Sequence, residues 1–165
     1  MSKKRINILT TVNSENVRRD GDVITIRDVL HAVDGVVLNK RLYTSKELAK
    51  GVASLKSRPA PAGHPKDSKG RQISASNGEA LGSSGLGAWC VNSRYEGGRA
   101  LYDIKVNAAQ ASALPAGKEV VARLYAAIAG TNTDTIGVSL GLLLEEVQGR
   151  EPGEGLHLRR HEHAV

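Results

Sequence analysis

The sequence predicts a strand-rich α+β fold, built around an antiparallel sheet or a small barrel with two short helices inserted between strands. Several segments have the alternating or β-branched composition of strands, and Gly97-Gly98 joins two of them as a hairpin. Only two segments repeat their apolar residues at helical spacing. Because the strands do not alternate regularly with helices, a parallel sheet is not expected. We expect residues 1–165 to form a single domain.

Strands are expected in both halves of the chain. They cover residues 5–12, 22–29, 36–39, 88–92, 100–106, 135–147 and 156–165. Asp34-Gly35 is typical of a hairpin turn. The polar stretches 13–21 and 66–87 are interpreted as loops, and the second is predicted to be mobile, with few buried side chains. The alternation of the last strand stops in mid-pattern at Val165, so we expect this strand to be truncated there.

Two helices are predicted from capping and spacing. The first covers residues 45–56, because Thr44 and Glu47 have the spacing of a capping box ahead of an apolar face. The second covers residues 118–129, where apolar side chains recur at i, i+3, i+4 and i+7 and Gly130 follows as a C′ residue.

Composition excludes several classes of protein. The single cysteine, Cys90, excludes an intramolecular disulfide and a cysteine-rich zinc site, and its strand context predicts a buried core residue. No apolar run approaches the roughly 20 residues of a membrane span. One Trp, four Tyr and no Phe argue against a base-stacking surface. The net charge of +6 fits either a solvated basic surface or attraction to an acidic partner.

A histidine and a serine stand in unusual backbone contexts. His64 lies in the sequence RPAPAGHP of residues 58–65, where the prolines restrict the backbone around it. Ser139 lies in an apolar strand with a glycine two residues to either side, which allows close approach of a substrate. A serine hydroxyl is a weak nucleophile until a base takes its proton, so the pair is the minimum for nucleophilic catalysis. A turn histidine and a small core serine are the alternative interpretation.

Four segments, taken in order, resemble a known family. They are GVVLNKRLY at 35–43, the turn at 58–65, IGVSLG at 136–141 and the charged final strand. Together they resemble the prohead (capsid maturation) serine proteases of tailed phages, distant relatives of the herpesvirus assemblins. The resemblance implies a herpesvirus-protease-like domain made in the host cytoplasm and packaged inside the procapsid. Its substrates would be the phage scaffold, the major capsid protein and the protease itself, and self-association is compatible with it.

The resemblance also assigns the site. His64 matches the catalytic histidine and Ser139 the nucleophile, while Glu162 is the preferred third member, with His161 or His163 as alternatives. No cofactor is expected, and without a cysteine cluster or an HExxH motif the terminal histidines do not predict a metal site. A catalytically inactive capsid-assembly module is the first alternative function. A basic nucleic-acid-binding domain is the second and less favoured one.

Overall fold

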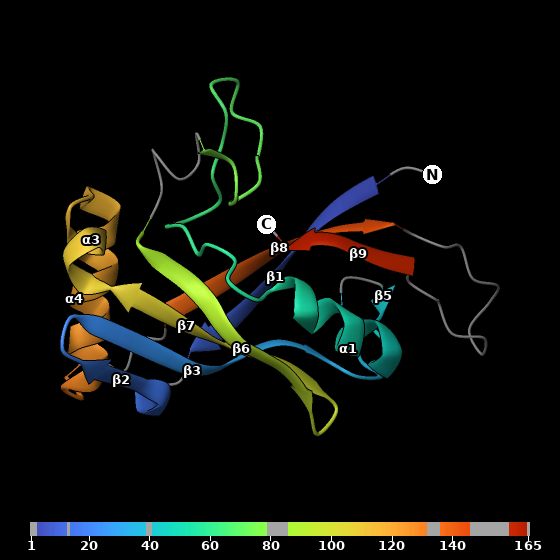
Figure 1. The fold of residues 1–165 in the computed structure, drawn as a ribbon, viewed down its shortest axis with the longest axis horizontal. Helices are drawn as coiled ribbons and strands as arrows, with labels where there is room; N and C mark the ends of the chain where they lie inside the picture. The colour runs from blue at the N-terminus through green and yellow to red at the C-terminus, as the bar shows by residue number, and fades with distance from the viewer. Residues whose placement is uncertain are drawn as a thin grey trace.

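The structure, a computed structural model, describes residues 3–12, 14–38, 41–78, 86–131, 136–145 and 159–164, with side chains over 14–37, 42–78 and 86–131. The elements are β1 (Lys3–Val12), η1 (Ser14–Asn16), β2 (Val17–Asp20), β3 (Val23–Val33), β4 (Val37–Leu38), β5 (Arg41–Leu42), α1 (Ser45–Ser54), β6 (Ala88–Glu96), β7 (Arg99–Asn107), α3 (Ala108–Ser112), α4 (Pro115–Ile128), β8 (Ile136–Glu145) and β9 (Arg159–Ala164) (Figure 1).

All the paired strands are antiparallel. The described strands form a four-stranded sheet in the order β2-β3-β7-β6, a three-stranded sheet in the order β1-β8-β9 and the small pair β4-β5. The hairpin predicted at Gly97-Gly98 connects β6 to β7. The predicted α+β class with an antiparallel sheet is therefore confirmed.

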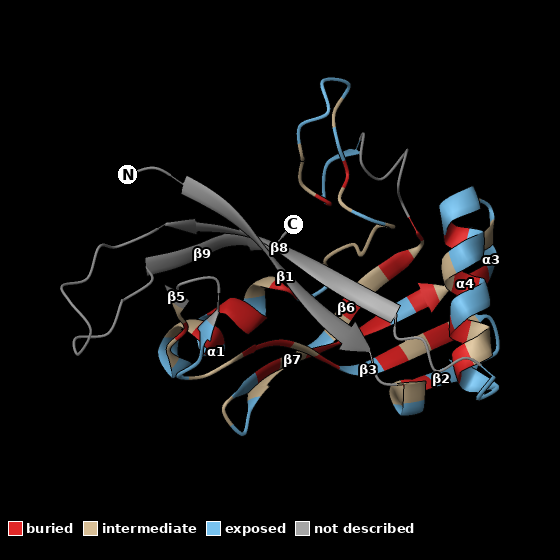
Figure 2. Ribbon diagram, turned by 180° about the vertical axis from the view of Figure 1, so that it is seen from behind, coloured by how far each residue is buried: buried red, intermediate tan, exposed pale blue. Residues whose placement is uncertain are grey.

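The core lies on one face of the four-stranded sheet. Alternate residues of its central strands are buried there, among them Ile24 of β3 and Tyr102 and Val106 of β7. Leu48 of α1 and Leu124 of α4 belong to the same cluster, so both helices pack on this face (Figure 2). Each such buried aliphatic side chain contributes about 1.5–3 kcal/mol to folding. Aliphatic burial therefore holds the sheet and the two helices together.

Both predicted helices are present with shifted ends. Thr44 caps α1, because its Oγ1 accepts a hydrogen bond from the backbone N–H of Glu47 at 3.4 Å, and α1 ends at Ser54. α4 begins at Pro115, three residues before the predicted start, since a proline at the first helical position lacks only an N–H that would have no partner in the helix. Gly130 follows α4 with a φ of +68°, as a C′ glycine does.

The prediction of a hairpin at Asp34-Gly35 is wrong. β3 pairs with β2 and β7, whereas β4 pairs with β5, so this turn joins two different sheets. The reason is that the N–H groups of the turn bond to residues outside it. The Asp34 N–H donates to the Gly98 carbonyl at 2.7 Å, and the Gly35 N–H donates to the Tyr43 carbonyl at 3.0 Å. The prediction of a loop over residues 13–21 is wrong for residues 17–20, which form the edge strand β2. Val17 is its only buried residue, so the strand has the polar composition of a loop.

The segment after the His64 turn contains a local hairpin within the stretch predicted to be a loop. Lys66 pairs with Gln72, and the Ile73 N–H donates to the Pro65 carbonyl at 3.0 Å. Of the described residues of the predicted loop, 66–78 and 86–87, only Ala75 and Leu86 are buried, as the prediction of few buried side chains requires. Mobility of this stretch stays a prediction, and residues 79–85 lie outside the described residues.

No helix among the described residues is long and apolar enough to cross a membrane.

Candidate active site

The His64 turn is attached to the edge of the four-stranded sheet. The Cys90 N–H donates to the Arg58 carbonyl at 2.7 Å, and the N–H groups of Ser57 and Ala60 donate to β6 carbonyls at 2.9 Å each. Pro59 forms an antiparallel bridge with Trp89. Residues 57–60 therefore add a short strand to the edge of β6, and the turn leaves that edge from a fixed point.

Local chemistry shapes the turn between this edge and His64. Pro59 and Pro61 lack an N–H, so Ala60 alone among residues 59–61 can donate to β6, and it does so. Gly63 has a φ of +73°, a left-handed conformation that a residue with a side chain adopts only at a cost in free energy. His64 follows, half-buried, and Pro65 after it is buried. The imidazole is therefore held on a restricted backbone with part of its surface accessible.

Helix α1 links the turn to the strands that carry the other candidates. It ends at Ser54, whose carbonyl accepts a hydrogen bond from Arg58 Nε at 3.0 Å, and the chain then enters the turn. α1 also contacts β6 and β9. β9 in turn pairs with β8. The elements that carry His64, Ser139 and Glu162 are thus connected through one helix and one sheet.

Ser139 lies on β8, the central strand of the three-stranded sheet. Its register partner on β1 is Leu9. Gly137 and Gly141 face Thr11 and Asn7, so glycine flanks the serine on both sides within the paired strand. The side chain of Ser139 lies outside the described residues, as do those of His161, Glu162 and His163.

The register of β9 against β8 places the candidates for the third position. Ala164 pairs with Leu142, and His161 pairs with Leu144, so Glu162 lies between these two points on the strand next to that of Ser139. We predict that Ser139 Oγ approaches His64 within about 4 Å and that Glu162 approaches the far nitrogen of His64. The side chains of Ser139 and Glu162 lie outside the described residues. Both approaches stay predictions.

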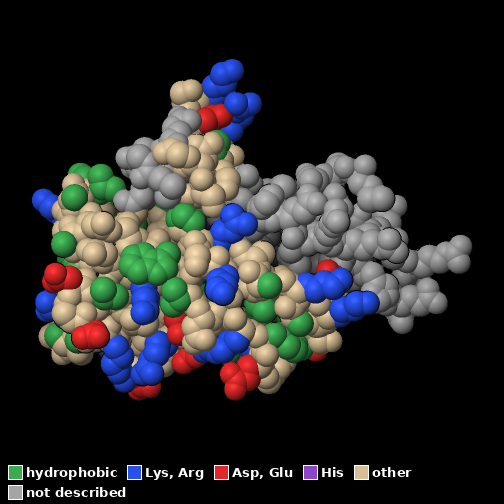
Figure 3. Space-filling model, in the orientation of Figure 1, with side chains coloured by type: hydrophobic (Ala, Val, Ile, Leu, Met, Phe, Trp, Pro, Cys, Tyr) green, Lys and Arg blue, Asp and Glu red, His purple; other side chains and the backbone are tan. Residues whose placement is uncertain are grey.

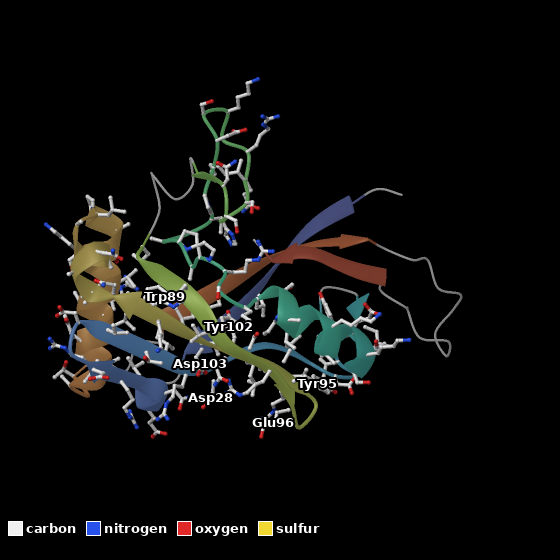
Figure 4. All side chains as sticks on the ribbon, viewed as in Figure 1. Asp28, Trp89, Tyr95, Glu96, Tyr102 and Asp103 are labelled. Carbon is white, nitrogen blue, oxygen red and sulfur yellow. The ribbon has the colours of Figure 1, made fainter. Side chains whose placement is uncertain are left out.

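A shallow apolar pocket lies where the turn meets β6. Its volume is about 200 Å³. It is lined by Pro59, Ala60, Pro61, Leu86, Gly87, Ala88, Trp89 and Gln110. Figure 4 shows Trp89 on β6, the strand that supports the turn. The pocket is therefore an apolar surface within a few residues of His64 in the sequence.

Cys90 is not a candidate nucleophile. Its residue surface is 4 % exposed, and burial raises the pKa of its thiol to about 12, so the reactive thiolate is suppressed. This confirms the prediction of a core residue. Among the described residues, no group of three or more His, Cys, Asp or Glu side chains could hold a metal ion.

Sequence reasoning missed a polar cluster around Asp103, a buried residue of β7. The carboxylate of Asp103 accepts hydrogen bonds from the Asp28 N–H at 3.0 Å, from Asn92 Nδ2 at 3.0 Å and from the Arg94 guanidinium at 3.2 Å. Arg94 also forms an ion pair with the Asp28 carboxylate. Figure 4 labels Asp28 and Asp103 on the neighbouring strands β3 and β7. We call these four residues the bulge clasp, because Asp28 and Asn92 stand at β-bulges of β3 and β6 with φ of +57° and +50°. An Asp inside the otherwise mostly apolar predicted strand 100–106, with Asp28 and Asn92 at the ends of other predicted strands, is the sequence signal that could have revealed it.

The comparisons with known proteins give a fold likeness. No family model matches the sequence, and no curated protein matches it. A solved structure, that of the bacteriophage T4 capsid assembly protease gp21, is similar over 100 % of this chain and 99 % of its own, with a TM-score of 0.56 and 14 % sequence identity. At this identity the likeness shows a shared fold, and residue roles do not transfer with it.

Proposed function

We propose that this protein is a serine endopeptidase that acts in phage prohead maturation. The likeness of the whole fold to a capsid assembly protease carries the proposal. It agrees with the resemblance of the His64 turn and the Ser139 strand to the prohead proteases, which depends on the sequence alone. The relation to the herpesvirus assemblins is part of the proposal.

The proposed reaction is acyl transfer. His64 accepts the proton of the Ser139 hydroxyl as its Oγ attacks the scissile carbonyl carbon and forms a tetrahedral intermediate. His64 then donates that proton to the leaving amine, the peptide bond breaks, and water releases the acyl group by the same steps. Glu162 accepts a hydrogen bond from the far nitrogen of His64 and stabilises the imidazolium. The substrates in this proposal are the phage scaffold, the major capsid protein and the chain itself, cleaved inside the procapsid in the host cytoplasm.

The restricted backbone at His64 supports this chemistry. A general base works when its position is fixed before the substrate binds, since a misplacement of about 1 Å can cost about 100-fold in rate. The three hydrogen bonds between residues 57–60 and β6 fix one end of the turn. The hydrogen bond from Ile73 to Pro65 fixes the other.

The first test is covalent labelling with a fluorophosphonate, in which a nucleophilic serine oxygen displaces fluoride from phosphorus. We expect one labelled serine, Ser139, identified by mass spectrometry. The Ser139→Ala and His64→Ala variants should lose the label, whereas Cys90→Ala should retain it. Labelling of a different serine would contradict the assignment. Absence of both labelling and cleavage in the wild type would favour the inactive assembly module.

The second test is cleavage of co-expressed capsid and scaffold proteins. Ser139→Ala and His64→Ala should each reduce processing by about 1,000-fold or more, and the double variant should be little worse, because residues that act as a unit are not additive. For the third position, Glu162→Gln is compared with His161→Gln and His163→Gln. The variant with the largest fall in kcat identifies the residue that orients His64.

A further inference from the structure

The second face of the four-stranded sheet is open in the described part of the chain. The buried residues of α1 and α4 cluster with the first face, which leaves most side chains of the alternate positions exposed or half-buried, with Asp103 as a buried exception. Trp89 on β6 pairs with Lys105 on β7, and Lys105 pairs with Thr25 on β3. Thr25 in turn pairs with Arg18 on the edge strand β2. Since paired residues of an antiparallel sheet point to the same side, these four side chains form one row across all four strands.

This row combines an apolar end with a cationic one. Trp89 is half-buried and forms part of the wall of the 200 Å³ pocket. Lys105 and Arg18 are exposed, and neither forms an ion pair among the described residues. Figure 3 shows hydrophobic side chains next to Lys and Arg on the surface over β6 and β7.

Two rows flank this one on the same face. One ends at the exposed Asp20 of β2, two residues from Arg18, and offsets one of the two positive charges. The row on the other side does not neutralise the cations. Asp103 lies there opposite Val91, but its carboxylate is already bonded to Arg94 and to the two bulges. The described groups of the Trp89 row therefore present net positive charge around an apolar pocket. A complementary ligand carries an apolar side chain next to carboxylates.

We propose that this row is a docking surface for an acidic, helix-forming polypeptide segment with one apolar anchor side chain. The anchor enters the Trp89 pocket, and carboxylates of the segment bind Lys105 and Arg18. Neighbouring strands lie about 4.8 Å apart, so these cations are about 5 and 14 Å from Trp89 along the row. At a rise of about 1.5 Å and about 3.6 residues per turn, acidic side chains about four and eleven residues from the anchor lie near these distances and on the same side of the helix as the anchor.

A helix fits this face better than an extended strand does. The backbone hydrogen bonds of the sheet lie within its plane, so a segment on the face receives none from it. A helix satisfies its own backbone groups and offers side chains alone. A single-stranded nucleic acid is the competing ligand, but the row has one aromatic ring, whereas stacking platforms use several.

The test uses Trp89 as its own reporter, because it is the only tryptophan in the sequence. The probe is a 14-residue acetylated alanine-rich peptide with one leucine, glutamates four and eleven residues after it, and no aromatic residue. It is titrated into the full chain carrying Ser139→Ala, so that cleavage cannot contribute to the signal. We expect a saturable blue shift of Trp89 emission that weakens as salt is raised.

Charge-reversal variants distinguish binding at the Trp89 row from a general effect of the protein's net charge. Lys105→Glu and Arg18→Glu should each weaken binding by about tenfold, as reversal of a contacting charge requires. Lys50→Glu, an equal charge change at an exposed position of α1, should leave it within about twofold. With a labelled peptide, Trp89→Ala should weaken binding by about 30-fold. Thermal denaturation checks that each variant is folded.

Three results would overturn the proposal. One is no change in Trp89 emission up to millimolar peptide, and another is an equal loss of affinity in Lys105→Glu and Lys50→Glu. The third is tighter binding of a 20-residue oligo-dT than of the peptide, which would assign the face to nucleic acid. The readout needs no catalysis, so this surface can be confirmed or rejected whatever the outcome for Ser139.

Discussion

Replacing Asp103 by Ala should remove the bulge clasp and destabilise the four-stranded sheet. Asp103 lies on the central strand β7, and its carboxylate bonds to the backbone of β3 and to the side chains of two β6 residues, Asn92 and Arg94. Alanine leaves these donors without their acceptor in a site where Asp103 is 7 % exposed. Asp28 and Asn92 would then keep their left-handed backbone with less support.

The magnitude follows from the groups left unpaired. A buried donor that loses its acceptor costs about 1–3 kcal/mol, and a charged one costs more. Asp28 and Asn92 are exposed residues, so water can replace the carboxylate as the partner of their N–H groups. Arg94 is partly exposed and retains Asp28 and Glu96 as neighbours, which reduces its share as well. We therefore expect Asp103→Ala to lower the free energy of unfolding by about 2 kcal/mol. For a chain of this size that is a fall in Tm of roughly 4–8 °C.

The pH dependence gives the prediction a second readout. Burial raises the pKa of Asp103, but hydrogen bonds from Asn92, from the Asp28 backbone and from Arg94, with the charge of Arg94, outweigh burial and hold the pKa below 3.8. The unfolded state then binds more protons than the native state in acid. The clasp therefore contributes its full stability above about pH 4 and loses it as the pH falls through the native pKa.

The assay is urea denaturation at pH 7 and at several values down to pH 3. Asp103→Asn keeps one acceptor oxygen and loses the charge, so its stability should fall less than that of Asp103→Ala and vary less with pH than that of the wild type. Asp22→Ala, at an exposed acidic position, is the control and should change stability by under about 0.5 kcal/mol. Equal effects of Asp103→Ala and Asp22→Ala would refute the reasoning.

Two further predictions concern packing. A Cβ on Gly117 would lie 1.9 Å from the carbonyl oxygen of Ala111, and backbone cannot move aside cheaply, so Gly117→Ala should lower stability by about 3 kcal/mol or more in denaturation. Gly78→Ala, with nothing within 4 Å, is its control, and similar losses in both would contradict the close approach of α3 to α4. Native Cys90 should react with a thiol reagent such as DTNB only as fast as the protein opens, whereas in urea it should react within seconds. Rapid labelling of the native protein would show that the thiol is accessible.

Local signals predicted the elements whose structure depends on neighbours in the sequence. The Gly97-Gly98 hairpin and the Thr44 cap both depend on residues within one turn, and the structure contains both. The start of α4 at Pro115 was missed because apolar spacing begins later than the helix, whose first turn is held by α3 through the Ala111–Gly117 contact. The spacing of apolar residues indicates where a helix buries its side chains, whereas capping residues indicate where the helix begins.

Pairing between distant segments was harder to predict. Asp34-Gly35 has the composition of a hairpin turn, but its two N–H groups bond to Gly98 and Tyr43, which lie in other connections. The Asp34 N–H bonds to a residue more than 60 positions away, and composition carries no information about such a partner. The sequence of β2 has the composition of a loop, because an edge strand needs only one buried residue, here Val17. The partner of β2 is the adjacent strand β3, so β2 was missed for its polar composition and not for a distant partner.

The candidate site shows the same division between local and distant signals. The restriction of His64 by prolines and glycine could be predicted, since it depends on the residues next to it. Its attachment to β6 could not, because the acceptors on Ala88 and Cys90 are about 30 residues away. β6 holds the His64 turn in place only while the register of β6 against β7 is fixed. The bulge clasp lies within the β6–β7 pairing, at the register shift between Val91 and Arg94. If the clasp sets the register, Asp103→Asn should reduce cleavage through kcat more than through KM, although Asp103 contacts no candidate catalytic residue in the described part of the chain.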